Sequence, residues 1–299
     1  MSAIIGIDAA WTSNHPSGVA LIRQMKTGKW ESVRVSCSYE KFLEYPTERT
    51  SRSVGGSVPV PALVETAIRL AQTDVNLVVA DIPIAMVPIS GLRCADRKVS
   101  KLFGDSGCST HAPSSIRPGR VSEEIRDGFR MCGFPLVTQQ NDLSDHALIE
   151  TYPHPALLSL MKTPYRVPYK VGNSKKYWCH LGQKERLIMI REKLDEILAA
   201  LRNVIEGIDF EVPQNPQGFS ALKPIEDKID ALVCAWVGIQ VMEGRAMAIG
   251  NKEASIWLPA DPPPSARSKD WSAYLASDAV ASEEFMQGLE DLPVQNRSI

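Results

Sequence analysis

The hydrophobic pattern of this chain begins with two short apolar runs, each of which ends at an aspartate. Residues 3–7 (AIIGI) precede Asp8, and residues 75–80 (VNLVVA) precede Asp81. Such runs are typical of strands that are buried on both faces of a sheet. Apolar residues at helical spacing over 61–72 predict a crossover helix between the two strands, which makes the strands parallel. Both carboxylates are then expected at the C-terminal edge of the sheet, where open α/β sheets bind ligands.

The remaining periodic segments extend this sheet and cover it with helices. Residues 18–25 and 30–38 are joined by a short turn, so they predict an antiparallel meander with the first strand. Residues 147–152 (ALIETY) predict a fifth strand, and residues 254–258 a small edge strand. Further predictions are a loop over 45–59, a short helix that starts at 93, a helix over 122–131 with Ser122 as its N-cap, and helices over 185–204, 224–242 and 271–289.

Composition narrows the class of protein. At 299 residues and 44% hydrophobic, the chain can bury a substantial core, and its net charge of −2 does not by itself indicate a nucleic-acid partner. No run approaches about 18 uncharged apolar residues, and the N-terminus lacks the pattern of a signal peptide. The six cysteines form no CxxC pair. We therefore expect no membrane partner, reduced thiols and a cytoplasmic location.

Positive charge is concentrated in two segments. Residues 93–120 hold six Lys or Arg against two Asp, and they lie within 84–142, which is expected to be an inserted region. Residues 162–191 hold eight Lys or Arg and one Glu. Interleaved basic and aromatic residues suit phosphate contacts and base stacking, although a solvated loop before the next helix explains the same composition. The aromatic residues of this second segment are Tyr165, Tyr169, Tyr177 and Trp178.

Three further acidic residues are candidates for a site. Glu150 stands inside the fifth strand, where a carboxylate either faces solvent or needs a paired or bound cation. Asp227 and Asp230 are three residues apart near the start of the helix over 224–242, so they share one side of it. Structural interpretations stay open, because acidic residues at a helix start suit the helix dipole and Asp8 could cap a turn.

Five motifs, in their order along the chain, carry a resemblance to a known family. They are IGIDAAW, VVADIP, RCADR, IETYPHPA and DKIDALVCAW. With them the chain resembles the family named domain of unknown function 429, a group of predicted nucleases with the ribonuclease H-like fold. The resemblance implies an α/β fold with a mixed five-stranded sheet, in which three antiparallel strands are followed by parallel strands, and with helices on both faces. It implies one domain over 1–260 with the insertion near 84–142, and it leaves a tail over 261–299 with one helix.

The resemblance also implies a metal-dependent nuclease that hydrolyses phosphodiester bonds. Asp8 and Asp81 match the acidic residues that end the first and fourth strands, and Asp227 and Asp230 match a pair on the last helix of Holliday-junction resolvases. Glu150 belongs to the motif of this family. Converging carboxylates repel one another unless cations neutralise them, and hard oxygen ligands favour Mg²⁺ or Mn²⁺.

Two such ions about 4 Å apart would activate a water and stabilise the leaving oxygen. Asp8 is expected to bridge both ions, Asp81 to bind one and Asp230 the other, with Asp227 assisting. This arrangement makes all four aspartates metal ligands and places Glu150 among the candidate catalytic residues.

Substrate and partners follow from the same resemblance. Arg93, Lys98 and Arg117 are the candidates for holding substrate phosphate, because guanidinium and ammonium groups bind phosphate oxygens. The expected partner is nucleic acid, with DNA or RNA undecided, and a homodimer is left open. Two other function classes stay open as well. One is a non-catalytic nucleic-acid or metal-binding module, and the other is a phosphotransferase or phosphohydrolase acting on a small molecule, with 55–56 and 104–107 as glycine-rich loops.

Overall fold

The computed structural model describes residues 2–12, 15–44 and 58–261. These residues belong to the first of two units, Met1–Ala266 and Arg267–Ile299. The helix predicted over 271–289 and most of the loop over 45–59 lie outside the described residues. No helix in the described segments is long and apolar enough to cross a membrane.

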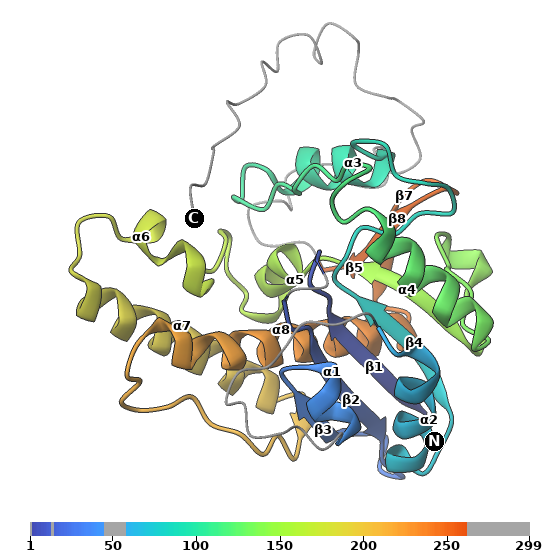
Figure 1. The fold of residues 1–299 in the computed structure, drawn as a ribbon, viewed down its shortest axis with the longest axis horizontal. Helices are drawn as coiled ribbons and strands as arrows, with labels where there is room; N and C mark the ends of the chain where they lie inside the picture. Colours follow the sequence, from blue (N-terminus) through green and yellow to red (C-terminus); the bar gives the residue numbers. More distant parts are fainter. Residues whose placement is uncertain (1, 13–14, 45–57, 262–299) are drawn as a thin grey trace, which may run out of the picture. The chain divides into compact units, whose positions relative to one another are not determined.

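A mixed sheet of eight strands forms the centre of the first unit (Figure 1). Its order is β6-β3-β2-β1-β4-β5-β8-β7. β1, β2 and β3 are antiparallel, whereas β4, β5 and β8 continue from β1 in parallel. The strands are β1 (Ala3–Asp8), β2 (Gly18–Gln24), β3 (Trp30–Ser36), β4 (Val75–Ala80), β5 (Ala147–Thr151), β6 (Ile205–Glu206), β7 (Ala246–Gly250) and β8 (Ser255–Pro259).

The predicted α/β class and the order of the first five strands are confirmed, but the number of five strands is wrong. β6 adds two residues in parallel to β3, and β7 and β8 form a hairpin beyond β5. The edge strand predicted over 254–258 is β8, which lies between β5 and β7. The short run of β7 (AMAIG) does not predict a strand from sequence, because its apolar and polar positions alternate only weakly.

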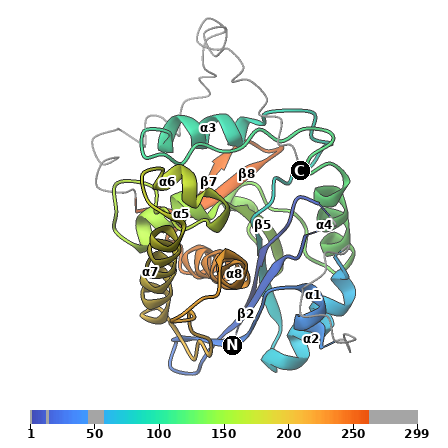
Figure 2. The ribbon, with the colours of Figure 1, turned by 60° about the vertical axis from the view of Figure 1, so that its left-hand side comes forward.

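Helices cover both faces of the sheet (Figure 2). On one face α8 packs on β1, β2 and β4, and α7 and α5 pack against α8. On the other face α2 lies on the same strands with α1 and α4 beside it, while α3 contacts β7 and β8. The helices are α1 (Tyr39–Leu43), α2 (Val60–Ala71), α3 (Cys94–Phe103), α4 (Arg120–Met131), α5 (Pro153–Leu160), α6 (Ser174–Tyr177), α7 (Gln183–Arg202) and α8 (Phe219–Met242), with 3₁₀ turns η1 (Gln140–Asp142) and η2 (Val171–Asn173).

Two glycines allow α8 to approach the sheet at van der Waals distance. A Cβ atom at Gly6 would overlap the carbonyl oxygen of Ala231, and one at Gly18 would overlap the carbonyl oxygen of Asp227. Gly18 pairs with Asp8 across the β1–β2 ladder. The absence of side chains at these two positions therefore brings the Asp227 turn of α8 directly beside the end of β1.

Two predicted helix starts are wrong. α4 begins at Arg120, so Ser122 lies inside the helix and its hydroxyl donates to the Gly119 carbonyl instead of capping. α8 begins at Phe219 and contains Pro224, which the sequence pattern had suggested as its first residue. The first turn of α8 has no acidic residue, so the helix-dipole interpretation of Asp227 and Asp230 does not apply.

Candidate functional site

Side-chain alternation in β1 and β4 sends two aspartates to the α8 face. Ile7 and Ala80 belong to the core cluster on the α2 side, so the next residues, Asp8 and Asp81, point to the opposite side. Ile7 pairs with Ala80 in parallel register, and the Asp81 N–H donates to the Ile7 carbonyl at 2.8 Å. Asp8 and Asp81 are therefore neighbours at the C-terminal edge of the sheet.

One face of α8 presents a lysine and three acids to the same edge. Lys223 Nζ lies 2.7 Å from Glu226 Oε1 and 2.6 Å from Asp227 Oδ1. Asp230 lies one turn farther along and is completely buried. These four residues stand at i, i+3, i+4 and i+7, the spacing that lines up one stripe of a helix.

A second lysine reaches these acids from the segment between α5 and α6. Lys170 Nζ lies 2.5 Å from Asp230 Oδ2 and 3.7 Å from Glu226 Oε1. The neighbouring Tyr169 hydroxyl donates to Asp230 Oδ1 at 2.5 Å, and the Val171 N–H donates to Glu226 Oε2 at 2.6 Å. Both oxygens of Asp230 and both oxygens of Glu226 thus have partners.

The two aspartates at the sheet edge ionise less readily than free aspartate does. Burial raises the pKa of Asp8 to about 6, with Lys170 opposing the shift and Asp227 adding to it. Burial and then the charge of Asp8 raise the pKa of Asp81 well above its ordinary value. These two carboxyl groups therefore hold protons at higher pH than free aspartate does, chiefly because burial disfavours their charged forms and secondarily because neighbouring carboxylates repel them.

The pKa values of the three acidic residues on α8 are set by burial and by the two lysines that contact them. Burial raises the pKa of Asp227 to about 6 against the effect of Lys223, and it raises the pKa of Asp230 to about 6 against the effect of Lys170. Burial also acts on Glu226, but Lys170 and Lys223 outweigh it and lower the pKa of that carboxyl. Burial likewise opposes the charge on Lys170, yet Asp230 and its neighbours keep the pKa of this ammonium well above its ordinary value.

Asp8 and Asp81 differ from the α8 acids in their hydrogen bonding. Among the described residues, no group donates a hydrogen bond to either carboxylate, and both side chains are only half-buried. No group of three or more His, Cys, Asp or Glu side chains in 2–12, 15–44 and 58–261 is placed to hold a metal ion. Two open carboxylates nevertheless fit Mg²⁺, which commonly binds through one or two carboxylates and fills its remaining positions with water and phosphate oxygens.

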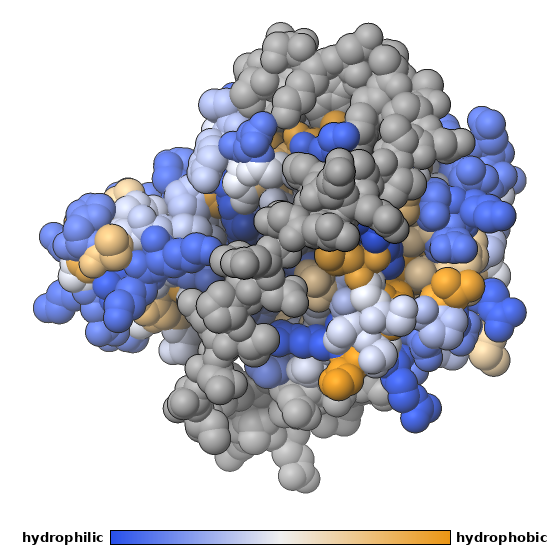
Figure 3. Space-filling model, turned by 90° about the horizontal axis from the view of Figure 1, so that it is seen from above, coloured by the Kyte–Doolittle hydropathy of each residue, from blue (hydrophilic) through white to orange (hydrophobic). Residues whose placement is uncertain are grey.

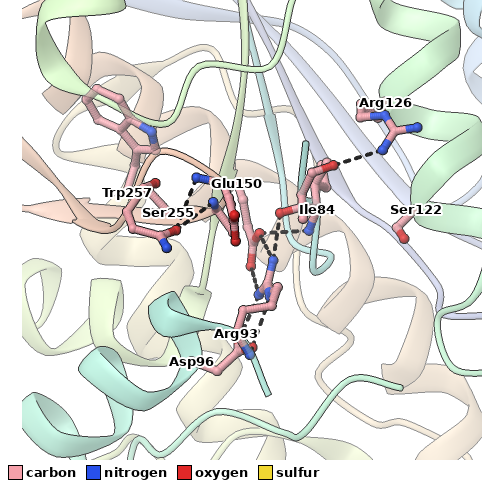
Figure 4. Close-up of polar contacts among 12 residues, drawn as sticks. Ile84, Arg93, Asp96, Ser122, Arg126, Glu150, Ser255 and Trp257 are labelled. Atoms are coloured by element: carbon pink, nitrogen blue, oxygen red, sulfur yellow. Dashed lines mark hydrogen bonds and ion pairs between the residues drawn. The ribbon is translucent and has the colours of Figure 1, made fainter. Parts of the chain in front are cut away.

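Glu150 takes part in a separate, buried network (Figure 4). Arg93 lies between Glu150 and Asp96, with Nη2 2.6 Å from Glu150 Oε1 and 2.7 Å from Asp96 Oδ1. Nη1 donates to Glu150 Oε2 and to the Ile84 carbonyl, and Nε donates to Asp96. The Ile84 N–H donates back to Glu150 Oε2 at 2.8 Å. The network thus fastens the loop that follows Asp81 to α3 and β5.

This network gives Arg93 a structural environment. Its side chain is only 7% exposed, and all three of its guanidinium nitrogens already donate to protein acceptors rather than to a phosphate. Burial raises the pKa of Glu150 to about 7 against the charge of Arg93. By alternation Glu150 shares a face with Leu148, which packs on the α2 side, away from Asp8.

The other two candidate phosphate-binding residues lie in different surroundings. Lys98 Nζ donates to the Gly250 carbonyl in β7 at 3.0 Å and is half-buried. Arg117 is exposed, and its guanidinium carbon lies 5.9 Å from the centre of the Trp11 ring. Because Trp11 follows Asp8 by three residues, the structure brings Arg117 close to the end of β1, whereas it fastens Lys98 to β7.

Further cations gather around His111, which contacts Trp11 edge-on at 6.4 Å between ring centres. Burial lowers the pKa of His111, and the charges of Arg166, Arg117 and Lys176 lower it further. Positive charge from both basic segments, 93–120 and 162–191, therefore acts at His111, which is in contact with Trp11.

The basic and aromatic segment over 162–191 is only partly exposed. Tyr165 is 61% exposed, whereas Tyr169 is fully buried against Asp230. Tyr177 and Trp178 are half-buried and contact each other edge-on at 5.6 Å. Figure 3 shows hydrophilic residues gathered on the side where Figure 1 places α6 and α7. Of these four aromatic rings, Tyr165 is the most available for stacking.

Sequence patterns missed the residues that hold the α8 acids. Lys223 precedes Pro224, so a helix started at the proline left it out, although its spacing to Glu226 and Asp227 identifies it once the helix start is known. Lys170 and Tyr169 lay inside the basic and aromatic segment, where nothing distinguished them from their neighbours.

The described chain is thus an α/β protein with a cluster of acids at the C-terminal edge of its sheet. Over residues 6–254 it matches the family described as "Protein of unknown function (DUF429)", and the chain belongs to that family, as the sequence motifs predicted. The crystal structure of the yeast mitochondrial Holliday junction resolvase Ydc2 is similar at 8% identity, with 80% of each chain covered and a TM-score of 0.33. Curated proteins give no match.

Proposed function

We propose that this protein is a metal-dependent nuclease of the ribonuclease H-like fold. The observation that carries the proposal is the Asp8–Asp81 pair, which has two half-buried carboxylates at the ends of adjacent parallel strands and no described donor for either. Leaving two such charges together without compensation is unfavourable, and a bound divalent cation removes the cost.

The strand arrangement supports the fold assignment. The family resemblance implies three antiparallel strands followed by parallel strands. The sheet has this order, with β4 and β5 parallel to β1, and α8 covers the face that carries Asp8. The acids also lie where ligands of open α/β sheets bind, outside the carboxyl ends of the parallel strands. The site itself, more than the fold, supports the activity.

Each residue of the acid cluster has a separate role in this proposal. Asp8 and Asp81 hold the divalent ion, which when bound polarises the phosphodiester and lowers the pKa of a water molecule. Lys223 neutralises Asp227 beside them, and Tyr169 and Lys170 fix Asp230 behind them. Glu150 positions the loop after Asp81 through Arg93 and takes no part in the chemistry.

A nucleic acid is the substrate class that the residues around Trp11 favour. Arg117 is an exposed cation near Trp11, and its charge and that of the exposed Lys176 both act on His111, which contacts Trp11. Cations that contact phosphates along a strand, together with an aromatic ring that stacks on a base, are the ordinary means of binding a single-stranded segment.

The test is cleavage of labelled single-stranded, duplex and four-way-junction DNA and RNA with Mg²⁺ or Mn²⁺. We expect cleavage of at least one polymer, its loss in Asp8→Asn, and full activity in Asp209→Asn, which makes the same change at an exposed aspartate in the loop before α8. Equal activity in Asp8→Asn and wild type would refute the proposal. Cleavage of p-nitrophenyl phosphate without any polymer cleavage would favour a small-molecule phosphohydrolase.

A further inference from the structure

The acid cluster contains two kinds of carboxylate. Asp227, Asp230 and Glu226 are bound by the ammonium groups of Lys223 and Lys170, while Asp8 and Asp81 receive no described hydrogen bond. Five acids therefore face two lysines, and the uncompensated charge is concentrated on the ends of β1 and β4.

Lys170 occupies the place where a cation would join α8 to the sheet edge. Its Nζ lies 2.5 Å from Asp230 Oδ2, and its charge also acts on Asp8 and Asp81. Tyr169 takes the other oxygen of Asp230, so neither oxygen is free for a metal ion. On the other side of Lys170, the Val171 N–H donates to Glu226 of α8. Both sequence neighbours of Lys170, Tyr169 and Val171, are thus hydrogen-bonded to α8, and these bonds hold Lys170 in place.

We propose that Lys170 is a resident cation that takes the place of a second metal ion, so that the protein binds one divalent ion, at Asp8 and Asp81. The inference rests on the proposed function and replaces the expected two-ion arrangement. Asp230 then serves to hold Lys170 and Tyr169 and is not a metal ligand. Two requirements follow: the binding stoichiometry is one, and Lys170 weakens the affinity for the ion because like charges repel.

The test is Mn²⁺ binding to the full chain, measured by isothermal titration calorimetry and by the EPR spectrum of the bound ion. Wild type is expected to bind one ion with the spectrum of isolated Mn²⁺. Asp230→Asn is expected to keep that ion, and Asp8→Asn to lose it. Lys170→Met is expected to bind the first ion at least about tenfold more tightly and to accept a second one. Lys252→Met, at an exposed lysine, is the matched control and should behave as wild type.

Each outcome decides between the two proposals. Two ions in wild type, one of them lost in Asp230→Asn, would overturn the role of Lys170 while leaving the nuclease proposal intact. If folded Lys170→Met binds Mn²⁺ with unchanged stoichiometry and affinity, that result would also overturn the role of Lys170 and leave the nuclease proposal intact. If Lys170→Met fails to fold, wild type and Asp230→Asn still decide the stoichiometry. No Mn²⁺ binding to wild type would refute the proposed function, and the inference with it.

Discussion

At the scale of single residues, the partners of each carboxylate set its part in the site. Four acidic residues of the cluster at the sheet edge and on α8 are aspartates, so the sequence does not distinguish them. Lysine ammonium groups lie within hydrogen-bond distance of Asp230 and Asp227, but not of Asp8 and Asp81. A charge that has its own counter-ion can be kept for structure. A charge without one is costly to the apo protein and useful when a cation binds.

This cost makes a first prediction about stability. Asp8→Asn is expected to increase the free energy of unfolding of the metal-free protein at pH 7 by about 1–3 kcal/mol, because the pKa of Asp8 lies near 6 and an amide imitates its protonated form. Urea denaturation at pH 7 with EDTA measures the change. The same variant should lose the rise in Tm that Mn²⁺ gives wild type.

Asp209→Asn provides the control, because that aspartate is exposed. It should change the free energy of unfolding by less than about 0.5 kcal/mol and keep the Mn²⁺ effect. A less stable Asp8→Asn in the absence of metal would show that the Asp8 carboxylate stabilises the fold, which would contradict an unpaired, costly charge at this position.

At the scale of elements, α8 shows what the sequence could and could not predict. Its apolar face and the Asp227–Asp230 spacing were readable, as were β1, β4 and the crossover between them. The first residue of α8 could not be predicted, because a proline is common at the first position of a helix and Pro224 suggested a start there. Only the packed structure shows that α8 begins before Pro224 and includes it. The Lys170 contact was unpredictable for a related reason, since it joins residues 60 apart in sequence through tertiary folding alone.

The close approach of α8 to β1 makes a second prediction. Gly6→Ala is expected to lower the free energy of unfolding by about 3 kcal/mol, because the new Cβ would overlap the backbone of α8 at Ala231 and push the helix away. Since Asp8 lies two residues beyond Gly6, the Mn²⁺ affinity of the folded protein should fall as well.

Gly91→Ala is the matched control for this change. A Cβ at Gly91 has nothing within 4 Å, so this variant should be close to neutral in both denaturation and Mn²⁺ binding. Equal stability of the two variants would contradict the close packing of α8 on β1.

The Arg93 network makes a third prediction, which concerns α3, β5 and the loop after β4. Glu150→Gln is expected to lower the free energy of unfolding by about 3 kcal/mol, because a buried arginine loses half of its counter-charge. Asp127→Asn breaks an ion pair with Arg126 in which the aspartate is 45% exposed, and it should cost less than about 1 kcal/mol. Thermal denaturation of both variants measures the contrast.

The same experiment separates a structural from a catalytic Glu150. A positioning role predicts that folded Glu150→Gln still binds Mn²⁺ and keeps a measurable fraction of its nuclease activity. Loss of all activity in a fully folded variant with normal Mn²⁺ affinity would instead assign Glu150 to the chemistry.

At the scale of the whole molecule, the acid cluster should change how stability depends on pH. The pKa values of Asp8, Asp227 and Asp230 are each raised to about 6, and the pKa of Asp81 is also raised well above its ordinary value. Between about pH 4 and pH 7 the folded protein therefore binds more protons at these groups than the unfolded chain does. Stability from these groups then falls as pH rises, by about 1 kcal/mol per carboxyl with a pKa near 6 between pH 5 and pH 7.

The contribution of the site is isolated by comparing the metal-free wild type with Asp8→Asn/Asp81→Asn. The double variant should gain stability relative to wild type as pH rises from 5 to 7, which urea denaturation at several pH values will show. Saturating Mn²⁺ should reverse the trend for wild type alone, because the ion binds the ionised carboxylates and competes with protons. A difference between the two proteins that stays constant with pH would mean that Asp8 and Asp81 titrate like free aspartates, and it would remove the electrostatic argument for a cation at this edge of the sheet.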